Sequence, residues 1–215
     1  MNINYYFDPL CPWCWLTSRW VISIKDELDL KIDWRPISLK FKNNEQYSEP
    51  FNQEPYISAF SYSTNALEIV ELLKKEGHAD RIEEFYTAVS TSFLRDNVMI
   101  EDGFNIETFL AEKLGALGLK PDYASRVNDP ELTELVKQST QHAVDAVGED
   151  CGTPIIEIVN QDSSVALFGP VISELPKGKE ESLKLWDAFV TLASYPDFWE
   201  IKRTRTKDPN LSDSF

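Results

Sequence analysis

The chain has 215 residues, a formal net charge of −15 at pH 7 and a sequence pI near 4.5. So acidic a surface repels nucleic acid and anionic lipid, which leaves a small molecule or another protein as the expected partner. The sequence contains no run of about 18 apolar residues, the length that a membrane-spanning helix needs.

A strand is predicted at the start of the chain, over residues 1–7, and the motif Cys11-Pro12-Trp13-Cys14 follows it. A signal peptide needs a basic start and an apolar run. Neither precedes this strand, so we expect a cytoplasmic protein. Three cysteines in a reducing compartment are not a structural disulfide framework. A CxxC motif there is expected to be catalytic or to bind a metal.

A zinc site is disfavoured by the residues that remain. Zinc is usually held by four ligands, often two CxxC pairs or one CxxC pair with two closely spaced histidines. Outside the motif the chain has only Cys151, His78 and His142, and no two of them are close in sequence. We therefore expect no metal and interpret the CxxC motif as a redox pair.

The motif has the features of a helix N-terminus that activates a thiol. Proline suits the first helical position, so Pro12 places Cys11 at the N-cap. The unpaired N–H groups and the positive end of the helix dipole favour an anion there, which lowers the pKa of the thiol. Cys11 is predicted to be the exposed nucleophile, and Cys14, one turn along, the more buried resolving thiol. Trp13 points away from the pair, and it either shapes the substrate surface or packs against a loop.

A helix from Pro12 to about Leu28 and a strand over residues 30–37 are predicted next. This strand-CxxC-helix-strand order is typical of the first half of a thioredoxin-like fold. A polar linker over residues 43–53 follows. We interpret residues 41–130 as an all-helical insertion, in which aromatic residues form the core or, alternatively, contact a cofactor. Its predicted helices carry these apolar stripes: Tyr56, Phe60, Leu67, Val70 and Leu73; Ile82, Phe85, Val89 and Phe93; and Phe109, Leu110 and Leu114, the last capped by Asn105.

The last third of the chain returns to strands. Asp129 before Pro130 is a typical helix start, and this helix is predicted to run to Gly148. A β-branched run at 155–159, a turn at 160–164 and residues 165–168 predict a hairpin. A final helix is predicted around residues 183–193. The expected fold class is α/β, with a thioredoxin-like domain formed by residues 1–40 and 131–215 around the helical insertion.

These motifs give the chain a specific resemblance. It resembles the DsbA-like branch of the thioredoxin superfamily, and within it the actinobacterial mycothiol-dependent nitroreductases, which are often grouped with 2-hydroxychromene-2-carboxylate isomerase-like proteins. The resemblance is weak across the helical insertion. The segments that carry it lie at both ends of the chain: residues 7–15, 17–20, 145–150, 152–154, 168–171, 185–187, 194–196 and 202–206.

The resemblance implies a thiol-disulfide oxidoreductase with Cys11 as nucleophile and Cys14 as resolving thiol. It implies no tightly bound cofactor and a low-molecular-weight thiol, mycothiol, as the reductant of a small electrophile or disulfide. It also implies that Pro154 follows a cis peptide bond and faces the CxxC motif, with the Thr153 backbone free to pair with a bound thiol substrate. Pro12 and Trp13, which lie between the cysteines, are the other expected substrate-binding residues.

Three residues near the predicted hairpin are candidate accessory groups. Cys151 stands where the family pattern predicts an apolar residue, so it is either a small buried hydrophobe or a thiol that traps oxidised Cys11. Glu149 and Asp150 are candidate acids that pair with the basic run at 202–205 or tune proton transfer at the thiols. That run is itself solvated, locks the tail onto the acidic body or binds a carboxylate-bearing partner.

Two alternative functions stay open at this point. The first is a glutathione-transferase-kappa-like isomerase, in which the thiol is not consumed, although that branch typically has serine rather than a CxxC pair. The second is a non-enzymatic redox sensor or holdase, whose helical insertion would bind partner proteins. A homodimer also stays open.

Overall fold

The computed structural model describes residues 1–44, 46–100, 103–161, 163–212 and 214. Its centre is a four-stranded mixed sheet in the order β2-β1-β3-β4. Strand β1 pairs in parallel with β2, and it pairs antiparallel with β3, which forms an antiparallel hairpin with β4. The strands are β1 (Asn2–Phe7), β2 (Lys31–Pro36), β3 (Ile155–Val159) and β4 (Ser164–Phe168). The predicted strands and the hairpin are confirmed, and Asp162 in the predicted turn lies outside the described residues.

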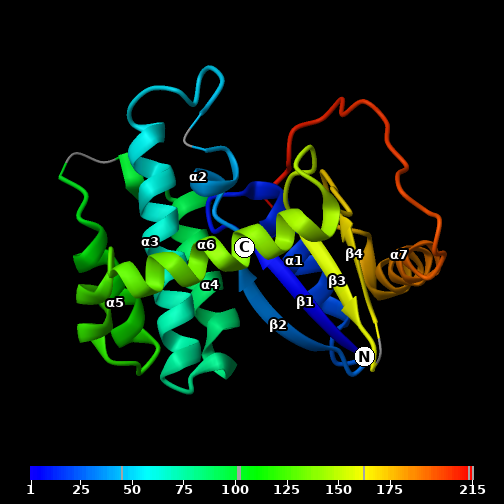
Figure 1. Ribbon diagram of the computed structural model, residues 1–215, viewed down its shortest axis with the longest axis horizontal. Coiled ribbons are helices and arrows are strands. Elements are labelled where there is room, and N and C mark those ends of the chain that lie inside the picture. Colours follow the sequence, from blue (N-terminus) through cyan, green and yellow to red (C-terminus); the bar gives the residue numbers. More distant parts are fainter. Residues whose placement is uncertain (45, 101–102, 162, 213, 215) are drawn as a thin grey trace.

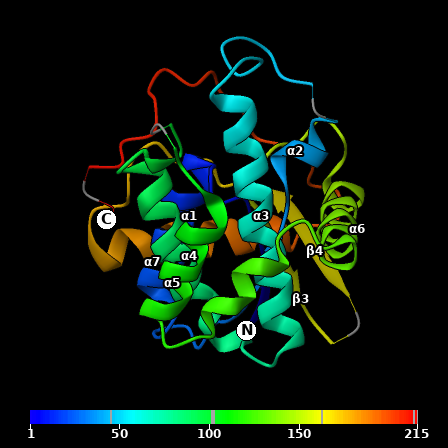
Figure 2. The ribbon, with the colours of Figure 1, turned by 90° about the vertical axis from the view of Figure 1, so that its left-hand side faces the viewer.

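Helices cover both faces of the sheet (Figures 1 and 2). Helix α6 (Pro130–Val147) lies on one face, and α1 (Pro12–Ile24) and α7 (Gly178–Ala193) lie on the other. The alternation of side chains along a strand explains these layers. Ile3 and Tyr5 of β1 pack into the large core, whereas Tyr6 packs with Ala143 of α6 in a smaller cluster.

The described residues between β2 and β3 form helices and loops only. The helices are α2 (Leu39–Lys42), α3 (Tyr56–Lys75), α4 (Ile82–Leu94) and α5 (Ile106–Ala116), with short 3-10 turns at Ala79–Arg81, Val98–Ile100 and Pro121–Arg126, followed by α6. The predicted N-caps are confirmed, because the Asn105 side chain accepts from the Thr108 N–H and that of Asp129 from the Glu131 N–H. The division of the chain into an insertion and a thioredoxin-like domain stays a prediction.

The first helix is shorter than predicted. Helix α1 ends at Ile24 rather than near Leu28. The chain reverses there through Asp29, which has a φ of 44°, and the Leu30 N–H donates to the Lys25 carbonyl. Leu28 still packs against the core. Its position therefore fitted the apolar pattern of the helix, although it lies in the turn that follows, and the predicted helix was too long.

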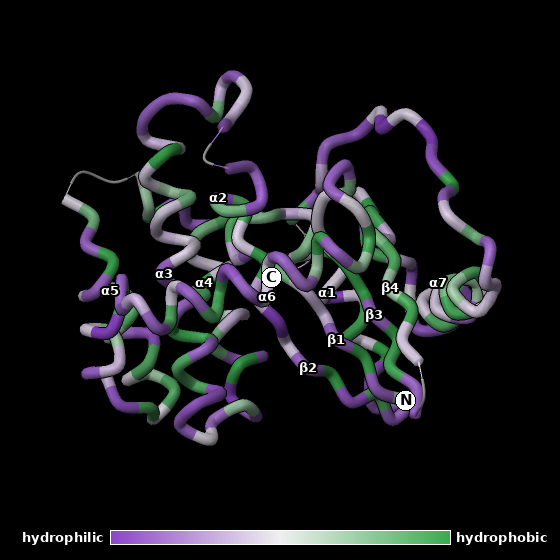
Figure 3. The backbone as a smooth tube through the Cα atoms, in the orientation of Figure 1, coloured by the Kyte–Doolittle hydropathy of each residue, from purple (hydrophilic) through white to green (hydrophobic). Residues whose placement is uncertain are grey.

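Hydropathy follows this architecture. In Figure 3 the connection before α3 and the chain after α7 are mainly hydrophilic, and Glu45 in the predicted linker lies outside the described residues. In the described part of the chain, no helix combines the length and apolar character needed to cross a bilayer.

Candidate active site

The CxxC motif spans the end of the loop after β1 and the first turn of α1. Cys11 is the N-cap, with extended backbone angles (φ −84°, ψ 113°), and Pro12 occupies the first turn, as predicted. The Cys11 N–H donates to the Asp8 carbonyl at 3.0 Å, which closes the loop after the strand. The Cys14 N–H donates to the Cys11 sulfur at 3.4 Å. One of the unpaired N–H groups of the helix end is therefore directed at the sulfur.

The two thiols differ in burial in the predicted order, but Cys11 is less accessible than predicted. Its exposed fraction is 5%, and that of Cys14 is zero. Thr153, itself 7% exposed, contacts Cys11 directly: its hydroxyl donates to the Cys11 sulfur at 3.1 Å. The helix N-terminus predicts a reactive thiol, but an approach by a residue 142 positions away has no signature in the local sequence.

Thr153 is placed by the sheet. It precedes β3, which pairs with β1 through Ile155 opposite Tyr6, so the start of β3 lies beside the end of β1, where the CxxC loop begins. The peptide bond between Thr153 and Pro154 is cis. The residues predicted to form opposite walls of one site, Cys11 and Thr153, are thus in direct contact.

The surroundings push the pKa values of the two thiols apart. Burial alone raises the pKa of Cys11, but hydrogen bonds from Cys14 and Thr153 outweigh it, and the pKa of Cys11 lies below its ordinary value. Burial raises the pKa of Cys14, and its proximity to Cys11 raises it further. A pair in which one sulfur is readily ionised and the other holds its proton is suited to thiol-disulfide exchange.

Replacing Thr153 with valine is expected to raise the pKa of Cys11 towards that of an ordinary thiol. The hydroxyl favours the charged sulfur, and a hydrogen bond to a charged group stabilises by about 1.5–3 kcal/mol. The measurement is a pH titration of the thiolate absorbance, with Thr108→Val, an exposed position on α5, as the control. An unchanged titration in the Thr153 variant would show that the helix N-terminus alone activates Cys11.

Asp8 is a buried acid that the sequence interpretation did not single out. It is fully buried, and burial raises its pKa. One carboxylate oxygen accepts from the Leu10 N–H at 2.9 Å and from the Ser63 hydroxyl, and the other accepts from the Leu39 N–H at 2.8 Å. Asp8 therefore ties the CxxC loop to α2 and α3. Its position, between an apolar strand and the CxxC motif, was the feature of the sequence that could have identified Asp8 as a residue of the site.

Trp13 is only partly buried and packs at the edge of the core. The guanidinium of Arg205, from the basic run, lies 5.2 Å from the centre of its ring. Pro12 is likewise partly exposed beside it. Pro12 and Trp13 are therefore the more exposed residues of the CxxC motif.

The candidate accessory residues have no direct contact with the thiols among the described hydrogen bonds. The Cys151 thiol donates to the Val147 carbonyl at 3.1 Å, and burial together with nearby Asp150 raises its pKa. Glu149 and Asp150 are exposed. Among the described residues, neither acid forms an ion pair with the basic run, and Lys202 lies 4.0 Å from the carboxylate of Glu200.

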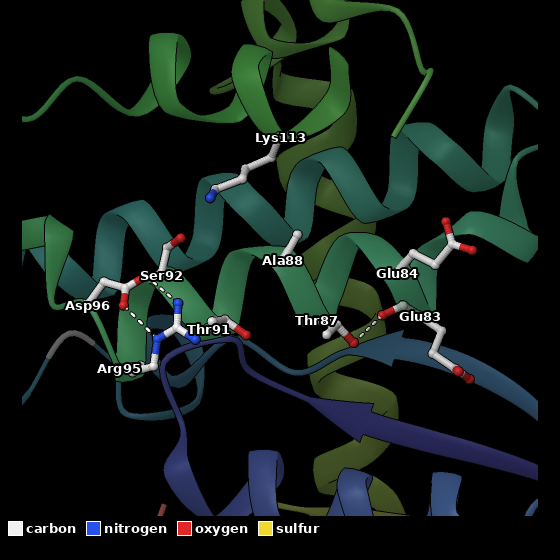
Figure 4. Close-up of a pocket in the computed structure, with 9 residues that line it drawn as sticks. All are labelled: Glu83, Glu84, Thr87, Ala88, Thr91, Ser92, Arg95, Asp96 and Lys113. Carbon is white, nitrogen blue, oxygen red and sulfur yellow. Dashed lines mark hydrogen bonds and ion pairs between the residues drawn. The ribbon is translucent and has the colours of Figure 1, made fainter. Parts of the chain in front are cut away.

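A separate hollow of about 410 Å³ lies between α4 and α5 (Figure 4). Polar and charged side chains line it, including Thr91, Arg95 and Lys113. None of the thiols lines it, so it does not belong to the candidate active site. Among the described residues, no group of three or more His, Cys, Asp or Glu side chains is arranged to hold a metal ion.

Solved structures with similar folds include three proteins of thiol or isomerase chemistry. Cytosolic disulfide reductase DsbM from Pseudomonas aeruginosa has a TM-score of 0.55 at 12% identity, over 89% of this chain and 100% of that one. 2-Hydroxychromene-2-carboxylate isomerase has a TM-score of 0.57 at 13% identity, over 89% and 96%. Oxidoreductase DsbA from Xylella fastidiosa has a TM-score of 0.51 at 18% identity, over 88% and 84%. These similarities confirm the predicted α/β, thioredoxin-like fold.

Sequence comparison identifies the family. The uncharacterized protein Rv2286c of Mycobacterium tuberculosis is 26% identical over 205 residues, which are 95% of this chain and 83% of that protein. The model of the Rv2466c-like family, described as mycothiol-dependent nitroreductase Rv2466c, matches residues 10–203. This match includes both the CxxC motif and the Thr153-Pro154 segment. The chain therefore belongs to the Rv2466c-like family of mycothiol-dependent nitroreductases, a family of thiol-dependent oxidoreductases.

Proposed function

We propose that the protein reduces small disulfides or electrophiles through a dithiol-disulfide cycle of Cys11 and Cys14, with electrons from mycothiol, in the cytoplasm. The observation that carries this proposal is the asymmetry of the pair: Cys11 has a lowered pKa and a small exposed area, whereas Cys14 has a raised pKa and none. The family supports a low-molecular-weight thiol as the reductant. The DsbM structure that has been solved with GSH shows that a protein of similar fold accepts a small thiol.

The cycle balances as two exchanges with a substrate disulfide. The Cys11 thiolate attacks one sulfur and releases the other half of the substrate as a thiolate, which takes up a proton. Cys14 then gives up its proton and displaces the remaining half, which closes the Cys11–Cys14 disulfide. Two molecules of mycothiol return the pair to dithiols and leave as their own disulfide. The net change is one substrate disulfide reduced and one mycothiol disulfide formed.

The surrounding residues have separate tasks in this cycle. The Thr153 hydroxyl and the Cys14 N–H, which donate to the Cys11 sulfur, stabilise its anionic form as nucleophile and again as leaving group. The Thr153 backbone is the pairing edge for the bound thiol. Pro12 and Trp13 form the outer wall. The isomerase alternative has less support, because an isomerase that does not consume its thiol has no step that requires a resolving cysteine such as Cys14.

The test of this function is to trap its intermediate. In Cys14→Ser the resolving thiol is absent, so the mixed disulfide on Cys11 is expected to accumulate when the protein is treated with a small disulfide. Mass spectrometry of the intact protein and of its peptides detects one added half-substrate on Cys11. The Cys11→Ser variant is the control, and Cys14 in it should stay unmodified because it is fully buried. An adduct on Cys14 or Cys151 would contradict the assignment.

A further inference from the structure

The chain after α7 returns to the start of α1. In Figure 1 it arches away from α7 and runs back towards the middle of the molecule. The Asn210 N–H donates to the Ser173 carbonyl at 2.8 Å, and Lys207 pairs with Glu174 at 3.2 Å. At the end of the tail, the Ser214 hydroxyl, which is buried, accepts from the Trp15 indole N–H at 2.8 Å. The last part of the tail, from Lys207 to Ser214, is therefore attached to the body at several points.

This path brings a cation to the CxxC motif. The Arg205 guanidinium lies 5.2 Å from the centre of the Trp13 ring, and Trp13 lies between the two cysteines in sequence. Within the described residues, neither Arg203 nor Arg205 has a carboxylate within salt-bridge distance, whereas Lys202 and Lys207 both do. Both arginines are exposed, so their donors are available to a ligand.

The position of Arg205 is not explained by a role in lowering the pKa of Cys11. The principal groups that act on the Cys11 sulfur are Cys14, Thr153 and Asp8, and none of them is basic. The chain as a whole carries a formal charge of −15, so its average field repels anions. A positive group over Trp13, inside the CxxC motif, locally opposes that field.

We propose that Arg205 binds the carboxylate of an anionic substrate and holds it against Trp13 beside Cys11. This inference rests on the proposed function. It assigns the substrate class as carboxylate-bearing disulfides or electrophiles and makes Arg205 a residue that determines specificity. Guanidinium groups recognise carboxylates in a planar, two-pronged geometry, and a Trp face beneath the cation keeps it oriented.

The test compares three disulfides that differ in charge: dianionic dithiobis(nitrobenzoate), neutral hydroxyethyl disulfide and dicationic cystamine. In Arg205→Gln we expect kcat/KM for the dianion to fall about five-fold, the effect of losing about 1 kcal/mol from one exposed charge contact. The values for the neutral disulfide should stay unchanged. Salt should weaken turnover of the dianion less in the variant than in the parent.

Two further variants separate charge from structure. Arg205→Lys keeps the charge and should retain most of the preference for the dianion. The matched control is Lys31→Gln, which removes an exposed cation at the start of β2, about 17 Å along the strands from their CxxC end at about 3.3 Å per residue. It should not change the preference. An equal loss on all three disulfides in Arg205→Gln would overturn the proposal, because it would mean that Arg205 merely supports Trp13.

A binding measurement distinguishes this proposal from the proposed function. Calorimetric titration with 4-nitrobenzoate and its neutral amide, without any reductant, should show tighter binding of the anion by the parent and loss of that preference in Arg205→Gln. If the protein binds the anion more tightly but does not turn over any disulfide, only the reductase proposal is contradicted. Turnover without any anion preference would sink the specificity proposal alone.

Discussion

Replacing Cys11 with serine is expected to lower kcat/KM for disulfide reduction by about 10³-fold or more, the scale seen when a covalent nucleophile is removed. No other group in the motif can take over, because Cys14 has no exposed surface and a raised pKa. The measurement is a mycothiol-coupled turnover assay. Serine keeps the size of the side chain and its capacity to accept from the Cys14 N–H and the Thr153 hydroxyl, so the fold should be preserved, which circular dichroism checks.

Cys151→Ser is the matched comparison for this result. The Cys151 thiol has a raised pKa and is bonded to the Val147 carbonyl, so we expect its replacement to leave turnover close to that of the parent. A loss of turnover there would instead support the backup-thiol hypothesis. Retained activity in Cys11→Ser would exclude both the thiol-dependent reductase and the thiol-dependent isomerase. Turnover lost in Cys11→Ser but kept in Cys14→Ser would indicate a route through one thiol.

Local signals in the sequence were sufficient for much of the site. The N-cap position of Cys11 follows from Pro12, since proline at the first helical position fixes where the helix begins. The β-branched run at 155–159 predicted the hairpin, whereas the resemblance to the family implied that Thr153 and Pro154 face the CxxC motif, where the pairing of β3 with β1 places them. Each of these features is decided by residues close together in the chain or by the general rules of the fold.

Contacts between distant residues could not be predicted in this way. Asp8 reaches Ser63, 55 positions away, and Arg205 reaches Trp13 across nearly the whole chain. The resemblance placed Thr153 near Cys11, but the hydrogen bond from its hydroxyl to the Cys11 sulfur was not predicted. Such contacts are set by how packed elements meet, and no periodicity or capping pattern in the sequence records them.

Replacing Asp8 with alanine is expected to destabilise the protein by about 2–4 kcal/mol near pH 4, measured as the free energy of unfolding in urea. The change leaves the Leu39 N–H and the Ser63 hydroxyl without their acceptor, whereas the Leu10 N–H keeps the Ser63 oxygen as a second acceptor at 3.2 Å, and each unsatisfied buried donor costs about 1–3 kcal/mol. Local collapse and water relieve part of this cost. Asp8→Asn should be milder, because its remaining oxygen still accepts from Leu10 and Ser63.

The pH dependence of this difference gives a sharper test. Burial raises the pKa of Asp8 above its ordinary 3.8, so the native state holds this proton more tightly than the unfolded chain. The stability that Asp8 contributes is therefore fully present below the unfolded-state pKa and is lost as the pH rises through the folded-state pKa. The difference in the free energy of unfolding between the parent and Asp8→Ala should be largest near pH 4 and should decrease towards neutral pH. Asp26→Ala, at an exposed carboxyl on the turn after α1, should show little change at either pH. A gap that widened with pH would mean that Asp8 is stabilised as an anion by its three donors, and the buried charge would then favour folding at neutral pH.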